Sequence, residues 1–351
     1  MISNKTCSFI TIIACLSIPL FFTSIQGRPS NSMIIADGKV IVSNERQNHT
    51  PDTSRKHQAL TDTSWSKAAE SMSTTKPLES AKVKQHGDTL KNKPGRPGKF
   101  IDPYRPQVML DGLKKAQAGD LKGAIEDFDS AIRKNPRNFN AYFYRAKAKI
   151  EYGDKTGAME DIDLAIKNKG DEAIYYYYRG KMLSDAGQTG KALVDFDMAI
   201  RLKRNFTDAL NYRGVERAKL GMHKEAIQDY DSAIISNPSY TLGYYNKGTS
   251  QAALGDFNAA MLSFSKSIQL DTTHVLSYLN RGNCYVQLKE YNLAIADFTS
   301  AIGLDPGNSD AYFNRGAAHF LSGDNLMCPD WQKAATLRND KARSYLEKYC
   351  K

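Results

Sequence analysis

The side chains that most often carry out chemistry are scattered in this chain. The six histidines form no HExxH motif, and the sequence contains no CxxC pair and no GxxxxGK[ST] phosphate loop. Metal sites, nucleophile elbows and phosphate loops each require fixed spacings of such residues. We therefore predict that the chain is not an enzyme, has no catalytic residue or metal site, and needs no cofactor.

Charged residues do recur at a fixed interval of 34. The basic set is Arg145, Arg179, Arg213, Lys247, Arg281 and Arg315, and the second set is Asp127, Asp161, Asp195, Asp229, Ser263 and Asp297. One interpretation is a cationic ladder for an anionic ligand. Pairing each acidic residue with the basic residue of the following repeat satisfies more junctions than pairing within a repeat. We therefore predict salt bridges between repeats that fix their stacking, each contributing less than about 1 kcal/mol where exposed.

The same period organises the chain from residue 105. Pro136, Pro238 and Pro306 are spaced by multiples of 34 and divide the sequence into the repeats 105–138, 139–172, 173–206, 207–240, 241–274, 275–308 and 309–342. An apolar stripe at helical spacing in the second half of each repeat predicts helix-turn-helix units.

Small residues recur at two positions of the repeat. Position 8 is Gly except for Ala146, and position 20 is Ala except for Cys328. We expect them to let paired helices approach closely. Position 15 is Gly except for Lys289, which fits a residue just past a helix end, where a positive φ favours Gly.

These columns, together with aromatic residues at position 24, resemble the tetratricopeptide repeat (TPR) family. The resemblance covers about two thirds of the chain and implies an all-α TPR α-solenoid, a right-handed superhelix whose first helices line a concave groove. The ending Cys328-Pro329-Asp330-Trp331, with Tyr345 and Tyr349 after it, resembles exported bacterial envelope TPR proteins. We expect residues 343–351 to form a C-terminal capping helix.

The family also implies which positions face the groove. Carried over to this chain, they give an aromatic, lysine-bearing half followed by an amide-rich half: Phe143, Tyr144, Lys147, Tyr177, Tyr178, Lys181, Tyr212, Tyr245, Asn246, Asn280, Asn283 and Asn314. Such side chains can hold an extended peptide by stacking and by hydrogen bonds to its backbone. The alternative is that some of the tyrosines pack between neighbouring helices.

The first 104 residues differ in composition from the repeats. The apolar run from Cys7 to Phe22 is shorter than the roughly 20 residues of a spanning helix, so residues 1–27 predict a signal peptide. An uncleaved anchor, or lipid attachment at Cys15, is the alternative. Residues 28–104 are polar, carry a net charge of +5 and predict a disordered linker. Gly95-Arg96-Pro97 is a weak match to a DNA-binding hook, and we expect no nucleic-acid partner.

Three cysteines remain after removal of the signal peptide. Cys328 and Cys350 both lie near the closing end of the array, so they are the candidate disulfide, with two buried thiols as the alternative. Cys284 is expected to be an inert buried thiol.

Together these features predict a non-catalytic scaffold or adaptor that binds a peptide or protein segment in its groove. Export would place it in the periplasm, the cell envelope or the extracellular space. Membrane contact is expected only if the signal is uncleaved or lipidated. The alternative function is an accessory or regulatory subunit of an exported enzyme complex.

Overall fold

A stack of helix pairs makes up nearly all of the described structure. The computed structural model describes residues 33–36, 39–42, 65 and 105–350. The first helices of the pairs are α2 (Arg105–Gln117), α4 (Phe139–Tyr152), α6 (Ala173–Asp185), α8 (Thr207–Lys219), α10 (Thr241–Ala253), α12 (Val275–Gln287) and α14 (Ser309–Ser322). Each begins at the residue where the 34-residue register starts a repeat.

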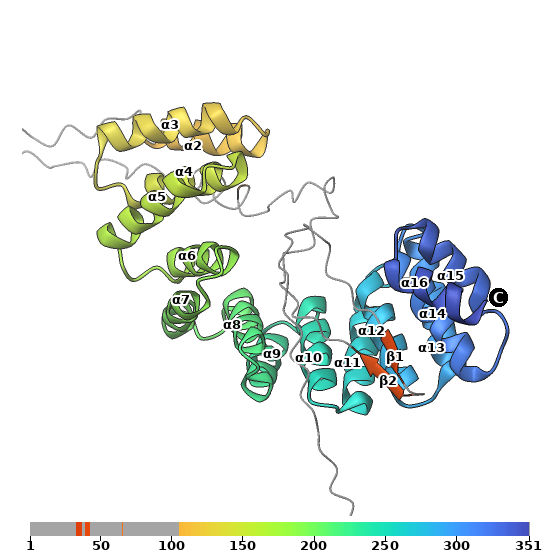
Figure 1. Ribbon diagram of the computed structural model, residues 1–351. Coiled ribbons are helices and arrows are strands. Elements are labelled where there is room, and N and C mark those ends of the chain that lie inside the picture. The colour runs from red at the N-terminus through yellow and green to blue at the C-terminus, as the bar shows by residue number, and fades with distance from the viewer. Residues whose placement is uncertain (1–32, 37–38, 43–64, 66–104, 351) are drawn as a thin grey trace, which may run out of the picture.

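The second helices run back against the first. They are α3 (Leu121–Lys134), α5 (Lys155–Asn168), α7 (Thr189–Leu202), α9 (His223–Ser236), α11 (Phe257–Leu270), α13 (Tyr291–Leu304) and α15 (Met327–Thr336). Contacts join the two helices of a pair and each second helix to the next first helix, and the pairs stack into the curved solenoid of Figure 1. The expected all-α repeat architecture is confirmed for residues 105–350.

The turn inside each repeat depends on one left-handed residue. Position 15 has a positive φ in all seven repeats, for example +99° at Gly153, and Lys289 adopts the same region at +62°. This confirms the prediction for the glycines. At Lys289 the same turn forms even though a residue with a Cβ atom disfavours a positive φ.

Helix contact within a repeat depends on glycine facing an aromatic ring. A Cβ atom on Gly214 would lie 2.6 Å from Tyr230, and one on Gly248 would lie 2.8 Å from Phe264. The expected close approach is therefore confirmed, and the ring at position 24 is what requires it. The second repeat has Ala146 and Ile162 instead, both fully buried, so a larger residue at position 8 occurs where position 24 is not aromatic.

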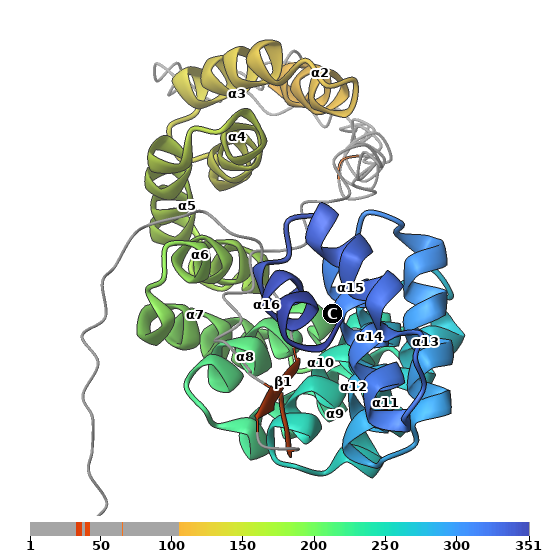
Figure 2. The same ribbon diagram turned by 45° about the vertical axis from the view of Figure 1, so that its right-hand side comes forward.

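The amino-terminal segment contains structure that the sequence prediction missed. Strands β1 (Met33–Ala36) and β2 (Lys39–Val42) pair antiparallel. β1 contacts α14 and β2 contacts α12. Figures 1 and 2 show the hairpin beside the helices of the C-terminal half of the array. The predicted linker of residues 28–104 therefore contains a short hairpin at 33–42, whereas the all-α prediction holds for the repeats. β-branched residues and the Asp37-Gly38 dipeptide favour such a hairpin. The predicted signal peptide lies outside the described residues.

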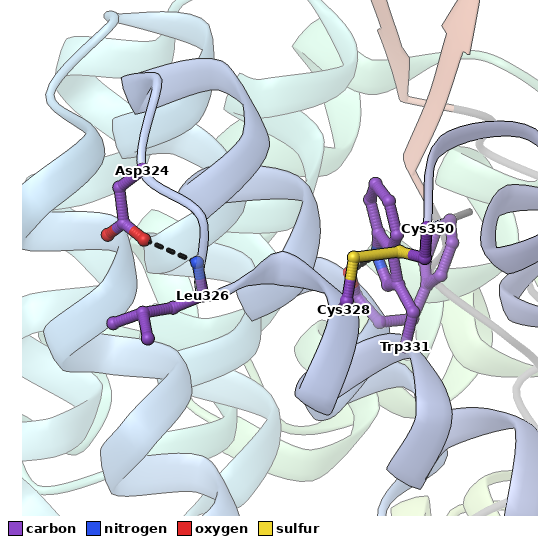
Figure 3. The surroundings of a disulfide bond; sticks show 6 residues. Asp324, Leu326, Cys328, Trp331 and Cys350 are labelled. Carbon is purple, nitrogen blue, oxygen red and sulfur yellow. Dashed lines mark hydrogen bonds between the residues drawn. A yellow bond between two sulfur atoms is a disulfide. The ribbon is translucent and has the colours of Figure 1, made fainter.

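The C-terminal end of the array is closed by α16 (Asp340–Tyr349). This helix begins three residues before the predicted 343, because the Asn339 side chain caps it by accepting from the Ala342 N–H. Trp331 is fully buried, and its Nε1 donates to the Phe313 carbonyl at 3.2 Å. Figure 3 shows the Cys328–Cys350 disulfide beside it, with a Cα–Cα distance of 5.8 Å.

No described helix is long and apolar enough to cross a membrane.

Candidate functional site

The twelve predicted groove residues all lie on first helices, but they differ in exposure. Five are half-buried: Tyr144, Tyr177, Tyr178, Lys181 and Tyr212. Seven are buried: Phe143, Lys147, Tyr245, Asn246, Asn280, Asn283 and Asn314. The partly exposed residues belong to α4, α6 and α8, so the accessible part of the candidate groove lies in the N-terminal half of the array.

An aromatic row connects these three helices. Phe143 on α4 lies 5.3 Å from Tyr178 on α6, and Tyr177 lies 5.7 Å from Tyr212 on α8, measured between ring centroids. The Lys181 Nζ is 5.8 Å from the centre of the Tyr212 ring. Burial raises the pKa of Tyr212 to about 12 and that of Tyr177 well above its ordinary value, so both hydroxyls stay protonated at neutral pH.

The amide half has a structural role. Asn246 donates to Asn211 at 2.8 Å, Asn280 to the Tyr245 hydroxyl at 3.3 Å, and Asn314 to Asn283 at 3.2 Å. Each bond joins one first helix to the preceding one. The sequence placed these amides on the correct helices, but only the structure shows that they bond across repeats, two to another asparagine and Asn280 to Tyr245.

Sequence reasoning missed an aromatic pocket at the start of the array. Trp65 is only 3% exposed, with its ring centroid 5.9 Å from Tyr144 and 6.4 Å from Phe128. The Lys147 Nζ lies 4.1 Å from the centre of the Trp65 ring, and the indole Nε1 donates to Glu151 at 3.1 Å. The only sign in the sequence was a large apolar residue within a polar segment.

A buried carboxylate was also missed. Glu216 on α8 is fully buried, and its Oε1 accepts from Ser184 at 2.6 Å and from Lys219 at 2.5 Å. Burial alone would raise the pKa of Glu216, but the hydrogen bonds from Lys219 and Ser184 lower it below the ordinary value. Ser184 and Lys219 occupy positions 12 and 13, which the family places on the groove.

The ion-pair ladder exists, but its predicted pairing is wrong. The Arg145 guanidinium binds Asp161 of its own repeat through two nitrogens, at 2.8 and 2.5 Å. Its third nitrogen donates to Asp129 of the preceding repeat at 2.5 Å. The predicted partner, Asp127, instead pairs with Lys115 of its own repeat at 2.8 Å. Position 23 thus pairs within a repeat, and position 25 makes the bond between repeats.

This arrangement is kept along the array with small changes. Arg179 and Arg213 repeat it, each between two aspartates. Arg281 and Arg315 donate to Ser265 and Thr299 in the preceding repeat. Lys247 pairs with Asp231 of the preceding repeat. Position 23 of its own repeat is Ser263, which has no carboxylate and donates to Gln251. These basic side chains therefore have structural partners in the protein.

Helix pairs stacked at a constant interval, with a concave inner face, define a helical-repeat protein of the solenoid class. The described residues hold no cluster of His, Cys, Asp and Glu able to bind a metal ion. Models of the tetratricopeptide repeat family match residues 112–173, 243–274 and 275–308, so the array contains tetratricopeptide repeats.

Solved structures show the same fold. One is the C-terminal part of a TPR repeat-containing protein from Cytophaga hutchinsonii, at 20% identity and a TM-score of 0.55, covering 67% of this chain and 98% of that one. Another is a tetratricopeptide repeat protein from Parabacteroides merdae, at 19% identity and a TM-score of 0.53, covering 70% and 98%. No curated sequence matches this chain. The fold is one that commonly serves as a protein-interaction scaffold.

Proposed function

We propose that this protein is a non-catalytic adaptor that binds an extended peptide or protein segment along α4, α6 and α8. The observation that carries the proposal is the half-buried row of Tyr144, Tyr178 and Tyr212 on three successive first helices. Tyrosine rings offer rigid contact area, and their protonated hydroxyls can donate to backbone carbonyls of a bound segment.

We further propose that the protein acts outside the cytoplasm. The apolar run of residues 7–22 supports this, as does the disulfide at the end of the array, since disulfides persist mainly in oxidising compartments. The partners would then be exported proteins.

Photo-crosslinking in the native host tests the binding site. A photoreactive residue at Tyr178, on the groove, is compared with one at Val194, which is 67% exposed on the second helix of the same repeat. We expect partner adducts from position 178 and few from position 194. Equal labelling from both positions would contradict the groove as the site. Capture of one enzyme rather than several proteins would favour the accessory-subunit function.

A further inference from the structure

Both described pieces of the amino-terminal segment lie on first helices of the array. The hairpin strands contact α12 and α14, and Trp65 lies against α4. We propose that Phe128, Tyr144, Lys147 and Glu151 form a tryptophan-binding pocket, and that the chain's own Trp65 fills it as a tethered ligand that a partner must displace. The displacement step rests on the proposed function, whereas the pocket does not.

The contacts select tryptophan rather than any apolar side chain. The indole forms a three-ring cluster with Phe128 and Tyr144, and the Lys147 ammonium lies 4.1 Å from its centre. Indole is the preferred aromatic partner of a cation. The bond from Nε1 to Glu151 then requires a ring N–H, which phenylalanine lacks.

The following repeat provides an internal comparison. Its equivalent residues are Tyr178, Lys181 and Asp185, but Ile162 stands where the first pocket has Phe128. Lys181 is half-buried, whereas Lys147 is 3% exposed beneath the indole. Lys181 has the same residue type, repeat position and helix face as Lys147 and is therefore its matched control. Because Lys181 also lies in the candidate groove, it is the control only for measurements of the Trp65 pocket and not for partner capture.

Trp65 has an advantage over a free peptide in binding the pocket, because it belongs to the same chain. A ligand on the same chain has an effective concentration of about millimolar, independent of the bulk concentration. A free tryptophan peptide must compete with it, so the pocket should bind such a peptide well only after Trp65 is removed.

The test measures binding of a synthetic peptide of residues 58–72 to the purified full chain by fluorescence anisotropy. We expect Trp65→Ala to strengthen binding at least tenfold over the wild type. Adding Lys147→Ala should reverse this gain, and adding Lys181→Ala should not. A peptide carrying alanine in place of Trp65 should not bind. Equal binding to the wild type and Trp65→Ala, or no binding to either, would overturn the proposal.

A second measurement avoids deleting Trp65, in case that variant loses helix content. Trp331 is fully buried and gives an internal reference for acrylamide quenching. We expect both tryptophans of the wild-type chain to be protected, and Lys147→Ala but not Lys181→Ala to raise quenching severalfold. One freely quenched tryptophan in the wild-type chain would overturn the pocket.

Crosslinking from Tyr178 separates the two proposals. More partner captured by Trp65→Ala than by the wild type supports displacement. Equal capture overturns displacement and leaves the adaptor function standing. No capture by either chain, with the peptide still bound by Trp65→Ala, contradicts the adaptor function and supports the pocket.

Discussion

At the scale of single residues, the clearest irregularity is Lys289. It adopts φ of +62° at a position where the other six repeats have glycine. A side chain in the left-handed region costs about 1 kcal/mol relative to glycine. We expect Lys289→Gly to raise the free energy of unfolding by about that amount in urea denaturation. The reverse change in the neighbouring repeat, Gly255→Lys, should lower it similarly, and a stabilising Gly255→Lys would refute the explanation.

Glu216 gives the groove a pH-dependent element. Its pKa is lowered in the folded protein, so its stabilising contribution is complete above the ordinary value of about 4.5 and is lost as pH falls through the lower folded pKa. We expect Glu216→Gln to be less stable than the wild type at neutral pH, with the two stabilities converging in acid. Thermal melts between pH 3 and pH 7 measure this difference. A constant difference in melting temperature across that range would contradict the lowered pKa of Glu216.

At the scale of helices, the pairing of glycine with an aromatic ring predicts a specific rescue. A Cβ on Gly248 would meet Phe264 at 2.8 Å, so Gly248→Ala should destabilise the protein by about 1–3 kcal/mol. Adding Phe264→Ile reproduces the natural pair of Ala146 with Ile162 and should recover part of that loss. A double-mutant cycle from denaturant melts gives the coupling energy. Strictly additive effects would mean that the ring does not set the helix spacing.

The ladder makes a second prediction at this scale. Arg179 is held by Asp195, whose side chain is 5% exposed, and by Asp163, whose side chain is 56% exposed. Asp195→Ala leaves a half-buried guanidinium without its bidentate partner and should cost about 2–3 kcal/mol. Asp163→Ala should cost less than about 1 kcal/mol. If both substitutions lowered the melting temperature equally, Asp195 would not be the more important partner of Arg179.

At the scale of the whole molecule, the array has two ends that repeats alone would leave uncovered. Near the first end, Trp65 belongs to the same buried cluster as Met109, Leu113 and Phe128. At the other end, α16 covers Trp331 with Tyr345 and Tyr349, and the Cys328–Cys350 disulfide links the end of α16 to α15. A solenoid needs such caps, because each terminal repeat otherwise exposes an apolar face.

Reduction tests the C-terminal cap. Opening a loop of 22 residues should destabilise this end by about 3 kcal/mol. We expect dithiothreitol to lower the melting temperature and to speed hydrogen exchange in α16. Cys328→Ser should have the same effect and abolish the response to reductant. Cys284 serves as the control: burial raises its pKa to about 12, so it should resist thiol reagents in the folded chain. An unchanged melting temperature on reduction would exclude a stabilising role.

The sequence by itself determined the repeat, its register and its turns. Gly153 and Gly323 mark helix ends by a backbone requirement, and Asp120 and Asn138 mark helix starts by capping. Both are local effects, fixed by residues a few positions apart. The positive-φ turn residue recurs in all seven repeats, whereas side-chain caps occur at only some helix starts.

Tertiary structure decided which side chains meet. Positions 23 and 25 are both acidic in several repeats, but their side chains point about 160° apart around the helix, toward different neighbours. Counting complementary charges could not distinguish them, so Asp127 was wrongly paired with Arg145. The pocket around Trp65 and the place of the hairpin depend on contacts over long sequence separations, 86 residues in the case of Trp65 and Glu151. No periodicity encodes such contacts, because they form only when the stacked helices present a surface for the amino-terminal segment to bind.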